Sequence, residues 1–256
     1  MADNVKPRVV AIIPARYASS RFEGKVIADL CGKPLVQRTY ERALRARLLD
    51  DVLIAVDDPR VAAALEPHGA HIVMTRADHP SGTDRIAEVA ETLEADIVVN
   101  LQGDEPLIDP ETIDRAVQAL IDHPEIPMAT VRHKMDDPRD AFDPNVVKVV
   151  CDSDGRALYF SRSPIPHVRG VTNASELPPC YWQHIGIYVY RRDFLMLYAH
   201  MEPSPLEELE KLEQLRVLEH GYPIAVVETK YKSIGVDTPE DLERVRALWT
   251  EDQPAR

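Results

Sequence analysis

Positive charge gathers in one loop of this 256-residue chain, directly after its first apolar run. The run Val9–Ile13 is typical of a strand buried on both faces of a parallel sheet. Arg16, Arg21 and Lys25 follow it, so they fall where ligands of open parallel sheets bind, beyond the carboxyl end of a strand. The chain as a whole is acidic, with a formal net charge of −13. A basic loop in an acidic protein indicates an anionic ligand, and a polyphosphate fits it best.

The residue types in this loop favour phosphate binding over the alternative, a solvated loop without a ligand. Arginine offers a forked set of donors and lysine a point charge. Ser19, Ser20 and Gly24 are expected to leave backbone N–H groups open to the ligand. The loop is not a Walker A motif, because Val26 follows Lys25 and no glycine stands five residues before Gly24.

Two acidic residues could hold a metal ion beside the phosphates. Asp104 follows Gly103 after the buried run Ile97–Leu101, and Gly103 should let the backbone approach a ligand closely. Asp237 lies just outside a helix whose start Thr238 already caps. The alternatives are an acidic turn for Asp104 and a surface acid for Asp237. Taken together, the two carboxylates predict a Mg²⁺ site.

A further carboxylate falls on a predicted helix over Ser204–Glu219. Leu209 marks the inward face of this helix, and Glu213, four residues later, lies on the same stripe. A core-facing carboxylate needs a partner. Two interpretations are equally supported. Either Glu213 pairs with Arg216 or is exposed at the edge of the stripe, or Glu213 and Gln214 hold the hydroxyls of a ligand.

The order of elements predicts an α/β fold with a doubly wound, mostly parallel sheet in a single domain over residues 1–256. After about residue 125 the alternation of strands and helices changes, and residues 128–190 are expected to include an inserted antiparallel or mixed region with a long loop at 163–180. Strands are expected at Val9–Ile13, Val52–Val56, Ala70–Met74, Ile97–Leu101, Met128–Arg132, Val146–Cys151, Ala157–Phe160, His184–Tyr190 and Ile224–Val227, and helices at Pro59–Leu65, Asp84–Leu93, Pro110–Ile121, Ser204–Glu219 and Pro239–Trp249.

Composition excludes several classes of protein. No apolar stretch approaches 18 residues, and the first residues lack the apolar core of a signal peptide. Cys31, Cys151 and Cys180 are few and widely spaced, which favours reduced thiols over disulfides or a zinc site. The acidic balance argues against nucleic acid as a main partner. We therefore expect a cytoplasmic protein that acts on a small molecule.

Several motifs in order resemble the CMP-KDO synthetases (3-deoxy-manno-octulosonate cytidylyltransferases) over roughly residues 9–249. The set in this order is far more specific than any one motif. The matching segments are P-A-R-Y-A-S-S-R-F-E-G-K (14–25), S-G-T-D-R (81–85), Q-G-D-E-P (102–106), L-E-Q-L-R (212–216) and V-D-T-P-E-D-L (236–242), together with D-P-N-V-V-K (143–148) and Y-F-S-R-S-P-I-P (159–166).

The resemblance implies a nucleotidyltransferase fold and a homodimer built through the inserted strands. It implies Mg²⁺-dependent transfer of CMP from CTP to the 2-keto sugar acid KDO, with release of pyrophosphate, in lipopolysaccharide precursor synthesis. By position, the catalytic set would be Arg16, Lys25, Asp104 and Asp237, the last two holding Mg²⁺. The nucleotide would contact Arg16, Ser19, Lys25, Arg76, Ser81, Gly82 and Gln102. The sugar acid would contact Arg162, His184, Tyr188, Glu213 and Gln214, with Arg162 as the partner of its carboxylate.

Two other functions remain open at this point. A cytidylyltransferase of the same fold could act on a related acid, such as 8-amino-KDO or sialic acid. A catalytically silent nucleotide-binding protein would release no pyrophosphate with any sugar. The presence of both candidate metal ligands favours an enzyme.

Overall fold

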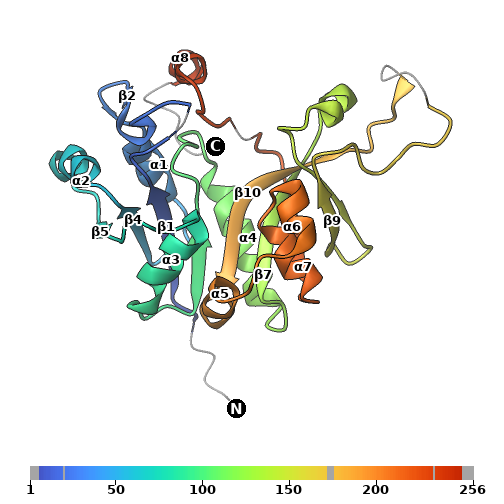
Figure 1. Cartoon of the computed structure of the whole chain (residues 1–256), viewed down its shortest axis with the longest axis horizontal. Helices are drawn as coiled ribbons and strands as arrows, with labels where there is room; N and C mark the ends of the chain where they lie inside the picture. The colour runs from blue at the N-terminus through green and yellow to red at the C-terminus, as the bar shows by residue number, and fades with distance from the viewer. Residues whose placement is uncertain (1–5, 20, 172–175, 233, 250–256) are drawn as a thin grey trace.

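One mixed sheet forms the centre of the computed structural model, which describes residues 6–19, 21–171, 176–232 and 234–249 (Figure 1). Along the main path of seven strands, neighbours are parallel, except that β10 runs antiparallel to β6 and β7. The mostly parallel, doubly wound sheet is therefore confirmed. In spatial order its strands are β11 (Ile224–Thr229), β7 (Met128–Lys134), β10 (Trp182–Arg191), β6 (Ile97–Asn100), β1 (Val9–Ala15), β4 (Asp51–Val56) and β5 (Ile72–Met74).

The pairing of β1 brings three loops to one edge of the sheet. β1 is buried on both faces and pairs in parallel with β4 on one side and β6 on the other. Ile12 lies opposite both Leu53 and Asn100, so these strands end at nearly the same level. The basic loop after β1 and the acidic loop after β6 are neighbours for this reason.

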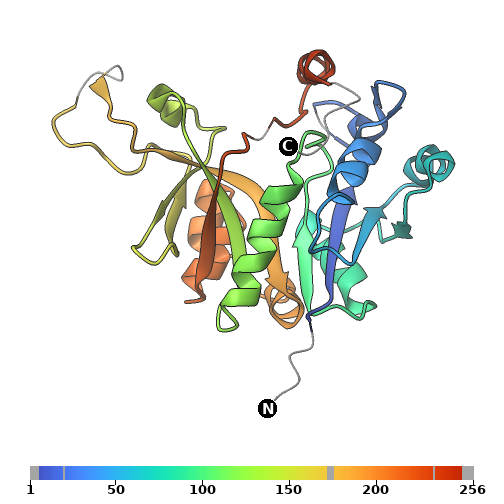
Figure 2. The same cartoon turned by 180° about the vertical axis from the view of Figure 1, so that it is seen from behind.

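Helices cover both faces of the sheet (Figures 1 and 2). Each packs an apolar stripe on the strands, as its 3.6-residue period requires. One face carries α1 (Leu35–Ala43), α2 (Pro59–Leu65) and α4 (Pro110–Asp122), and the other carries α3 (Gly82–Glu91), α5 (Arg192–Ala199) and α7 (Gln214–Glu219). A smaller core joins α8 (Pro239–Leu248) to the short hairpin of β2 (Asp29–Leu30) and β3 (Lys33–Pro34).

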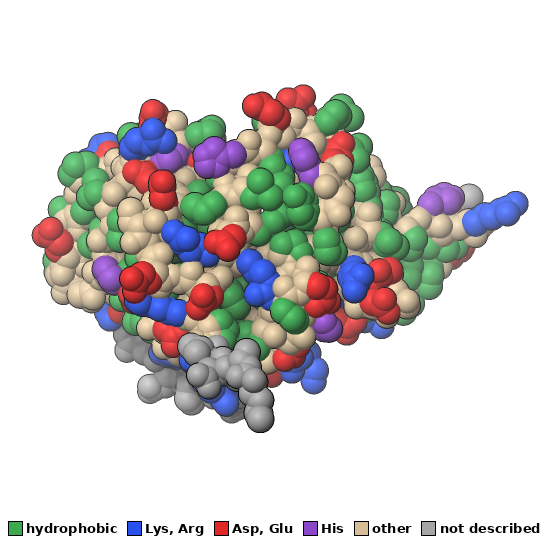
Figure 3. Space-filling model, turned by 90° about the horizontal axis from the view of Figure 1, so that it is seen from below, with side chains coloured by type: hydrophobic (Ala, Val, Ile, Leu, Met, Phe, Trp, Pro, Cys, Tyr) green, Lys and Arg blue, Asp and Glu red, His purple; other side chains and the backbone are tan. Residues whose placement is uncertain are grey.

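The region expected to be inserted contributes to two parts of the molecule. β7 and β10 belong to the main path of the sheet. β8 (Lys148–Cys151) and β9 (Ala157–Ser161) form an antiparallel hairpin that joins the same sheet through the pairing of β8 with β10. The turn of that hairpin has Gly155 at a φ of 78°, as the D-S-D-G sequence indicates. The loop after β9 stands out from the body, and charged side chains of both signs are interspersed over the face seen in Figure 3.

The predicted helix over Ser204–Glu219 is wrong in one respect. The chain forms two short helices, α6 (Pro205–Glu210) and α7, separated by Lys211 in the left-handed conformation at φ 53° and ψ 48°. The turn at Lys211 redirects the chain, so Leu212 is buried while Leu209, expected to face inward, is 80% exposed. Within the described residues, no helix is long and apolar enough to cross a membrane.

A buried ion pair fixes the start of the basic loop. Arg85, on α3, is fully buried and donates from Nη2 to Oδ2 of Asp57 at 3.1 Å, and from Nη1 to Thr75 Oγ1 and to the Arg76 carbonyl. The other Asp57 oxygen accepts the backbone N–H of Tyr17 at 3.1 Å. Burial lowers the pKa of Arg85, and the Asp57 carboxylate opposes that shift. The pair therefore holds the main chain next to Arg16.

Removing the buried cation should destabilise the fold. Arg85→Met should lower the free energy of unfolding by about 3 kcal/mol, because it leaves the Asp57 carboxylate buried without its partner. The measurement is urea denaturation. Arg244→Met is the control, since Arg244 pairs with Asp241 at the surface and is 60% exposed. An equal loss in both variants would show that the buried pair contributes little.

Candidate active site

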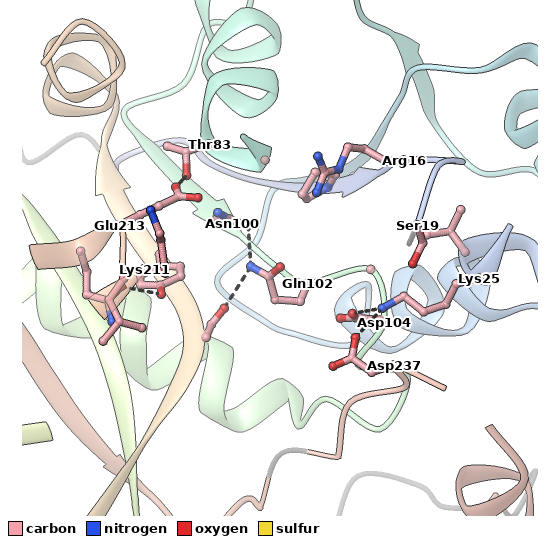
Figure 4. Close-up of a pocket in the computed structure, with 18 of the residues that line it drawn as sticks. Arg16, Ser19, Lys25, Thr83, Asn100, Gln102, Asp104, Lys211, Glu213 and Asp237 are labelled. Carbon is pink, nitrogen blue, oxygen red and sulfur yellow. Dashed lines mark hydrogen bonds and ion pairs between the residues drawn. The ribbon is translucent and has the colours of Figure 1, made fainter. Parts of the chain in front are cut away.

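A cavity of about 680 Å³ opens at the carboxyl edge of the sheet. Figure 4 shows Lys25, Asp104 and Asp237 at one end, Lys211 and Glu213 at the other, and Gln102 between them. The cavity brings together most of the predicted site residues, from segments far apart in the chain. Those that line it are Arg16, Ser19, Lys25, Gly82, Gln102, Asp104, Tyr188, Glu213, Gln214 and Asp237.

Lys25 joins the two predicted metal ligands. Its Nζ donates to Oδ2 of Asp104 at 2.6 Å and to Oδ1 of Asp237 at 3.0 Å, and the side chain is only 12% exposed. Arg21 pairs with the second oxygen of Asp237 at 3.0 Å. Burial alone would lower the pKa of Lys25, but the two carboxylates more than offset it and the pKa is raised.

The two acids meet because their loops are hydrogen-bonded to each other. The backbone N–H of Val236 donates to the Asp104 carbonyl at 3.0 Å. Asp237 precedes the capping box that Thr238 and Asp241 form at the start of α8, as predicted. A protein site for Mg²⁺ often supplies only one or two carboxylates and leaves the other positions to phosphate oxygens and water. No cluster of three or more metal-binding side chains occurs in the part of the chain described, and the two converging carboxylates fit such a site.

The two glycines of these loops make close contacts with the rest of the protein. A Cβ on Gly103 would lie 3.1 Å from the Pro14 carbonyl oxygen, so the absence of a side chain lets Gly103 pack closely against β1. Gly103 also lines the cavity, and its close approach to a ligand stays a prediction. The N–H of Gly24 donates to the Tyr17 carbonyl at 3.0 Å, and it is therefore not open to a phosphate. Ser20 lies outside the described residues. The hydrogen bond between Gly24 and Tyr17 connects the two ends of the basic loop and so helps to hold Lys25 in place.

The opposite end of the cavity is built from amide, hydroxyl and carboxylate groups. Gln214 accepts from the Tyr188 hydroxyl at 3.3 Å, while its own Nε2 is buried with no hydrogen-bond partner among the described residues. Thr83 donates to Glu213 at 2.7 Å. Desolvation by the surrounding protein raises the pKa of Glu213, although the residue stays accessible from the cavity. A buried unsatisfied N–H beside a carboxylate is suited to binding hydroxyl groups.

The alternative reading of Glu213 as the partner of Arg216 is wrong. Arg216 donates from Nε to Oε2 of Glu207 at 2.7 Å, and Glu207 also accepts the backbone N–H of Ser204 at 3.2 Å. This ion pair ties α7 back onto α6. Glu213 is thereby left at the junction between the helices, facing the cavity.

Several lining residues were missed by the sequence analysis. Asn100 accepts from Gln102 Nε2 at 3.3 Å, and that nitrogen also lies 3.3 Å from the Gly186 carbonyl oxygen. Asn100 could have been found, because it is a polar residue at the end of the otherwise apolar strand β6. Thr83 and Lys211 carried no such signal, since each faces the cavity only through the tertiary fold.

Two predicted nucleotide contacts do not line the cavity. The Arg76 side chain is exposed, and its Nε lies 3.8 Å from Asp78. The Ser81 hydroxyl forms the capping box of α3 with Asp84. These residues lie at the margin of the site, and their roles stay predictions.

Two predicted sugar contacts lie behind the cavity wall. Arg162 donates from Nε to the Glu210 carbonyl at 2.7 Å and from Nη1 to the Pro144 carbonyl at 2.9 Å. His184 is buried and lies 2.8 Å from the Thr130 hydroxyl. Burial lowers the pKa of His184 to about 3, so the ring is neutral at physiological pH. Both residues support the wall from outside, and neither lines the space.

The doubly wound sheet and the basic loop facing two carboxylates define a nucleotidyltransferase. A family profile described as cytidylyltransferase matches residues 10–234. The chain is 55% identical to the 3-deoxy-manno-octulosonate cytidylyltransferase of Geotalea uraniireducens over 93% of this chain and 97% of that protein, and 54% identical to that of Solibacter usitatus over 94% of each. It is similar to a solved CMP:2-keto-3-deoxy-manno-octonic acid synthetase complexed with CTP, at 47% identity and a TM-score of 0.88, covering 94% of this chain and 98% of that one. The chain belongs to the family of 3-deoxy-manno-octulosonate cytidylyltransferases.

Burial of neutral His184 should make stability depend on pH. The ordinary pKa near 6.5 applies to the unfolded chain, which therefore takes up a proton from about pH 6.5 downward while the folded protein does so only near pH 3. The contribution of neutral His184 to the free energy of unfolding is therefore fully present above about pH 6.5. It is lost as the pH falls, by roughly 2 kcal/mol between pH 7.5 and pH 5. His184→Gln should show a flatter profile than the unaltered protein in denaturation experiments across this range. His220→Gln, at an exposed histidine, is the control. Parallel profiles for all three proteins would contradict the assignment.

Proposed function

We propose that this protein transfers CMP from CTP to 3-deoxy-D-manno-octulosonate, giving CMP-KDO and pyrophosphate for lipopolysaccharide precursor synthesis. The observation that carries the proposal is the meeting of Lys25 with Asp104 and Asp237 at one end of a cavity whose other end is lined by Glu213 and Gln214. A triphosphate needs cations and a metal, and a sugar needs hydrogen-bonding groups. Relatives named for this reaction align over nearly the whole chain.

The reaction in this proposal is an in-line displacement at phosphorus. The anomeric hydroxyl oxygen of the sugar forms a bond to the α-phosphorus of CTP, the bond to the bridging oxygen of the β-phosphate breaks, and the hydroxyl proton is released. Such transfer depends on positioning and charge neutralisation more than on covalent catalysis. Mg²⁺, when bound by Asp104 and Asp237, would lower the pKa of the attacking hydroxyl and polarise the α-phosphate.

Other residues of the chain neutralise charge and bind the two substrates. Arg16 and Lys25 neutralise the charge that develops on the departing pyrophosphate. Gln102, whose amide is oriented by its hydrogen bond to Asn100, lies where it can contact the base or ribose. Gln214 Nε2 donates to a sugar hydroxyl and so gains the hydrogen bond that it lacks in this structure.

A pyrophosphate-release assay tests the proposal. It compares the four nucleoside triphosphates against KDO, 8-amino-KDO and sialic acid, with and without Mg²⁺. We expect release with CTP and KDO, loss of release with a chelator, and recovery on adding Mg²⁺. Faster release with either other acid would reassign the acceptor. No release with any pair would favour a silent nucleotide-binding protein.

Asp104→Asn should lower kcat by about 100-fold, because the change removes one negative charge from the proposed metal site where transition-state charge must be balanced. The melting temperature should change little, since Lys25 keeps Asp237 as its partner. Asp136→Asn, at an exposed ion pair with Lys232, is the control. A near-normal kcat for Asp104→Asn with Mg²⁺ would show that the metal assignment is wrong.

We further propose a cytoplasmic homodimer that forms through the inserted hairpin. Leu158 on β9 and Phe142, at the end of the short helix Pro138–Phe142, are large apolar side chains that the single chain leaves exposed. Light scattering after size-exclusion chromatography should give the mass of two chains. Leu158→Glu should shift the protein toward the monomer, whereas Leu209→Glu, at an exposed leucine on α6, should not. A monomeric mass for the unaltered protein would contradict the proposal.

A further inference from the structure

Thr83 lies on the first turn of α3 and lines the cavity (Figure 4). Its hydroxyl donates to Oε2 of Glu213 at 2.7 Å, although the two residues are 130 positions apart in the chain. The same turn includes Ser81 and Gly82, which are predicted to contact the nucleotide. The contact therefore joins the helix on the nucleotide side to a carboxylate at the end of the cavity remote from Lys25.

Among the described residues, Thr83 is the hydrogen-bond donor that reaches the Glu213 carboxylate. Arg216, on the same helix as Gln214, is committed to Glu207 through two nitrogens, Nε at 2.7 Å and Nη2 at 2.5 Å. The Tyr198 hydroxyl donates to the Glu213 carbonyl at 2.8 Å, so it fixes the backbone and not the side chain. A neutral hydroxyl thus orients this carboxylate where no described cation pairs with it.

The place of Thr83 in α3 suits a carboxylate partner. The helix spans ten residues and begins with the capping box of Ser81 and Asp84. Backbone N–H groups in the first turn of a helix carry a partial positive charge, which favours a negative charge nearby. Glu213 is exposed to the cavity, and its second oxygen has no hydrogen-bond partner among the described residues. That oxygen can accept a hydrogen bond from a hydroxyl group of a ligand.

The charged and titratable groups around Glu213 come from every element packed against it. They are Asp84 on α3, Tyr198 on α5, Glu207 on α6, Lys211 between α6 and α7, Arg216 on α7, and Tyr188 and Tyr190 on β10. Desolvation by burial raises the pKa of Glu213, and the hydrogen bond from Thr83 opposes that shift. Removing the Thr83 hydroxyl leaves all of these groups in place, so it should raise the pKa of Glu213 further.

We propose that Thr83 is a positioning residue that holds the Glu213 carboxylate where it accepts a hydrogen bond from a hydroxyl group of the sugar acid. This inference rests on the proposed function and adds to it a residue that acts through Glu213. The start of α3 then contributes to binding of the acceptor as well as of the nucleotide.

The first test removes only the hydroxyl. Thr83→Val, which keeps the shape of the side chain, should raise KM for KDO by about 10-fold, because Glu213 loses the hydrogen bond that orients it, while KM for CTP stays within about twofold. Thr83→Ser, which keeps the hydroxyl, should retain a KM close to that of the unaltered protein. Thr92→Val, at an exposed threonine where the same helix ends, is the control. Equal KM values for KDO in Thr83→Val and Thr92→Val would overturn the proposal, as would an equal rise in KM for CTP.

The pH dependence of the same variants gives a second readout. The value of kcat/KM for KDO should fall at low pH as Glu213 takes up a proton. In Thr83→Val this fall should begin about one pH unit higher than in Thr83→Ser, because the carboxylate lacks its donor. Measuring both variants at each pH cancels the titration of the substrates. Profiles that differ by one constant factor at every pH would contradict the proposal, since a merely structural role would produce that result.

A double variant separates positioning from direct contact. If Thr83 acts through Glu213, adding Thr83→Val to Glu213→Gln should raise KM for KDO no further than Glu213→Gln alone. Multiplied effects would mean that Thr83 binds a substrate itself, and they would overturn the proposal. Thr83→Ala replaces Thr83→Val should that variant not fold. An unaltered protein that releases no pyrophosphate with KDO would refute the proposed function itself, whereas normal release together with an unaffected Thr83→Val would refute only the role of Thr83.

Discussion

The arrangement of the site depends on a single ammonium group held between two carboxylates. Lys25 comes from the loop after the first strand, Asp104 from the loop after β6, and Asp237 from the segment before the last helix. Three parts of the chain thus converge on one nitrogen. Like charges repel where two acids approach each other, and the cation offsets that cost. The hydrogen bond from Val236 to the Asp104 carbonyl keeps the two loops adjacent in addition to the charges.

The buried pair of Arg85 and Asp57 supports this arrangement from the other side of β1. It fixes the main chain at Tyr17, and the Tyr17 carbonyl in turn accepts the N–H of Gly24, next to Lys25. The basic loop is therefore held at both ends by hydrogen bonds to the scaffold. A site organised in this way keeps its cations in place and needs little reorganisation when charge develops.

Local sequence signals predicted most strands and several helices of the scaffold, because such signals act over a few residues. The apolar runs became strands, and Thr238 caps the last helix as predicted. The helix predicted from Asp84 begins earlier, at Gly82 after the cap Ser81, and α1 and α5 were not predicted. The prediction of one long helix through Lys211 was wrong because the break depends on contacts between residues that are not sequence neighbours. No glycine or proline marks the break, which comes from tertiary contacts: the ion pair between Glu207 and Arg216 and the burial of Leu212. The acids of the site could be chosen from sequence, but their distance from one another depends on the fold. Arg162 shows the same limit, because only the structure reveals that its donors face backbone carbonyls.

The strand β10 begins after the loop that stands out from the body and continues to the cavity. Its pairing contains an irregularity along the way. Its pairing with β7 shifts between Ile185 and Tyr188, so that two residues, Gly186 and Ile187, have no counterpart on β7. The outer segment pairs in one register and the inner segment in another. The two unpaired residues have other contacts, since the Ile187 carbonyl accepts from the Thr130 hydroxyl at 2.8 Å. Gly186 lines the cavity and its carbonyl oxygen lies 3.3 Å from Gln102 Nε2, so this irregular stretch of β10 shapes the cavity wall directly.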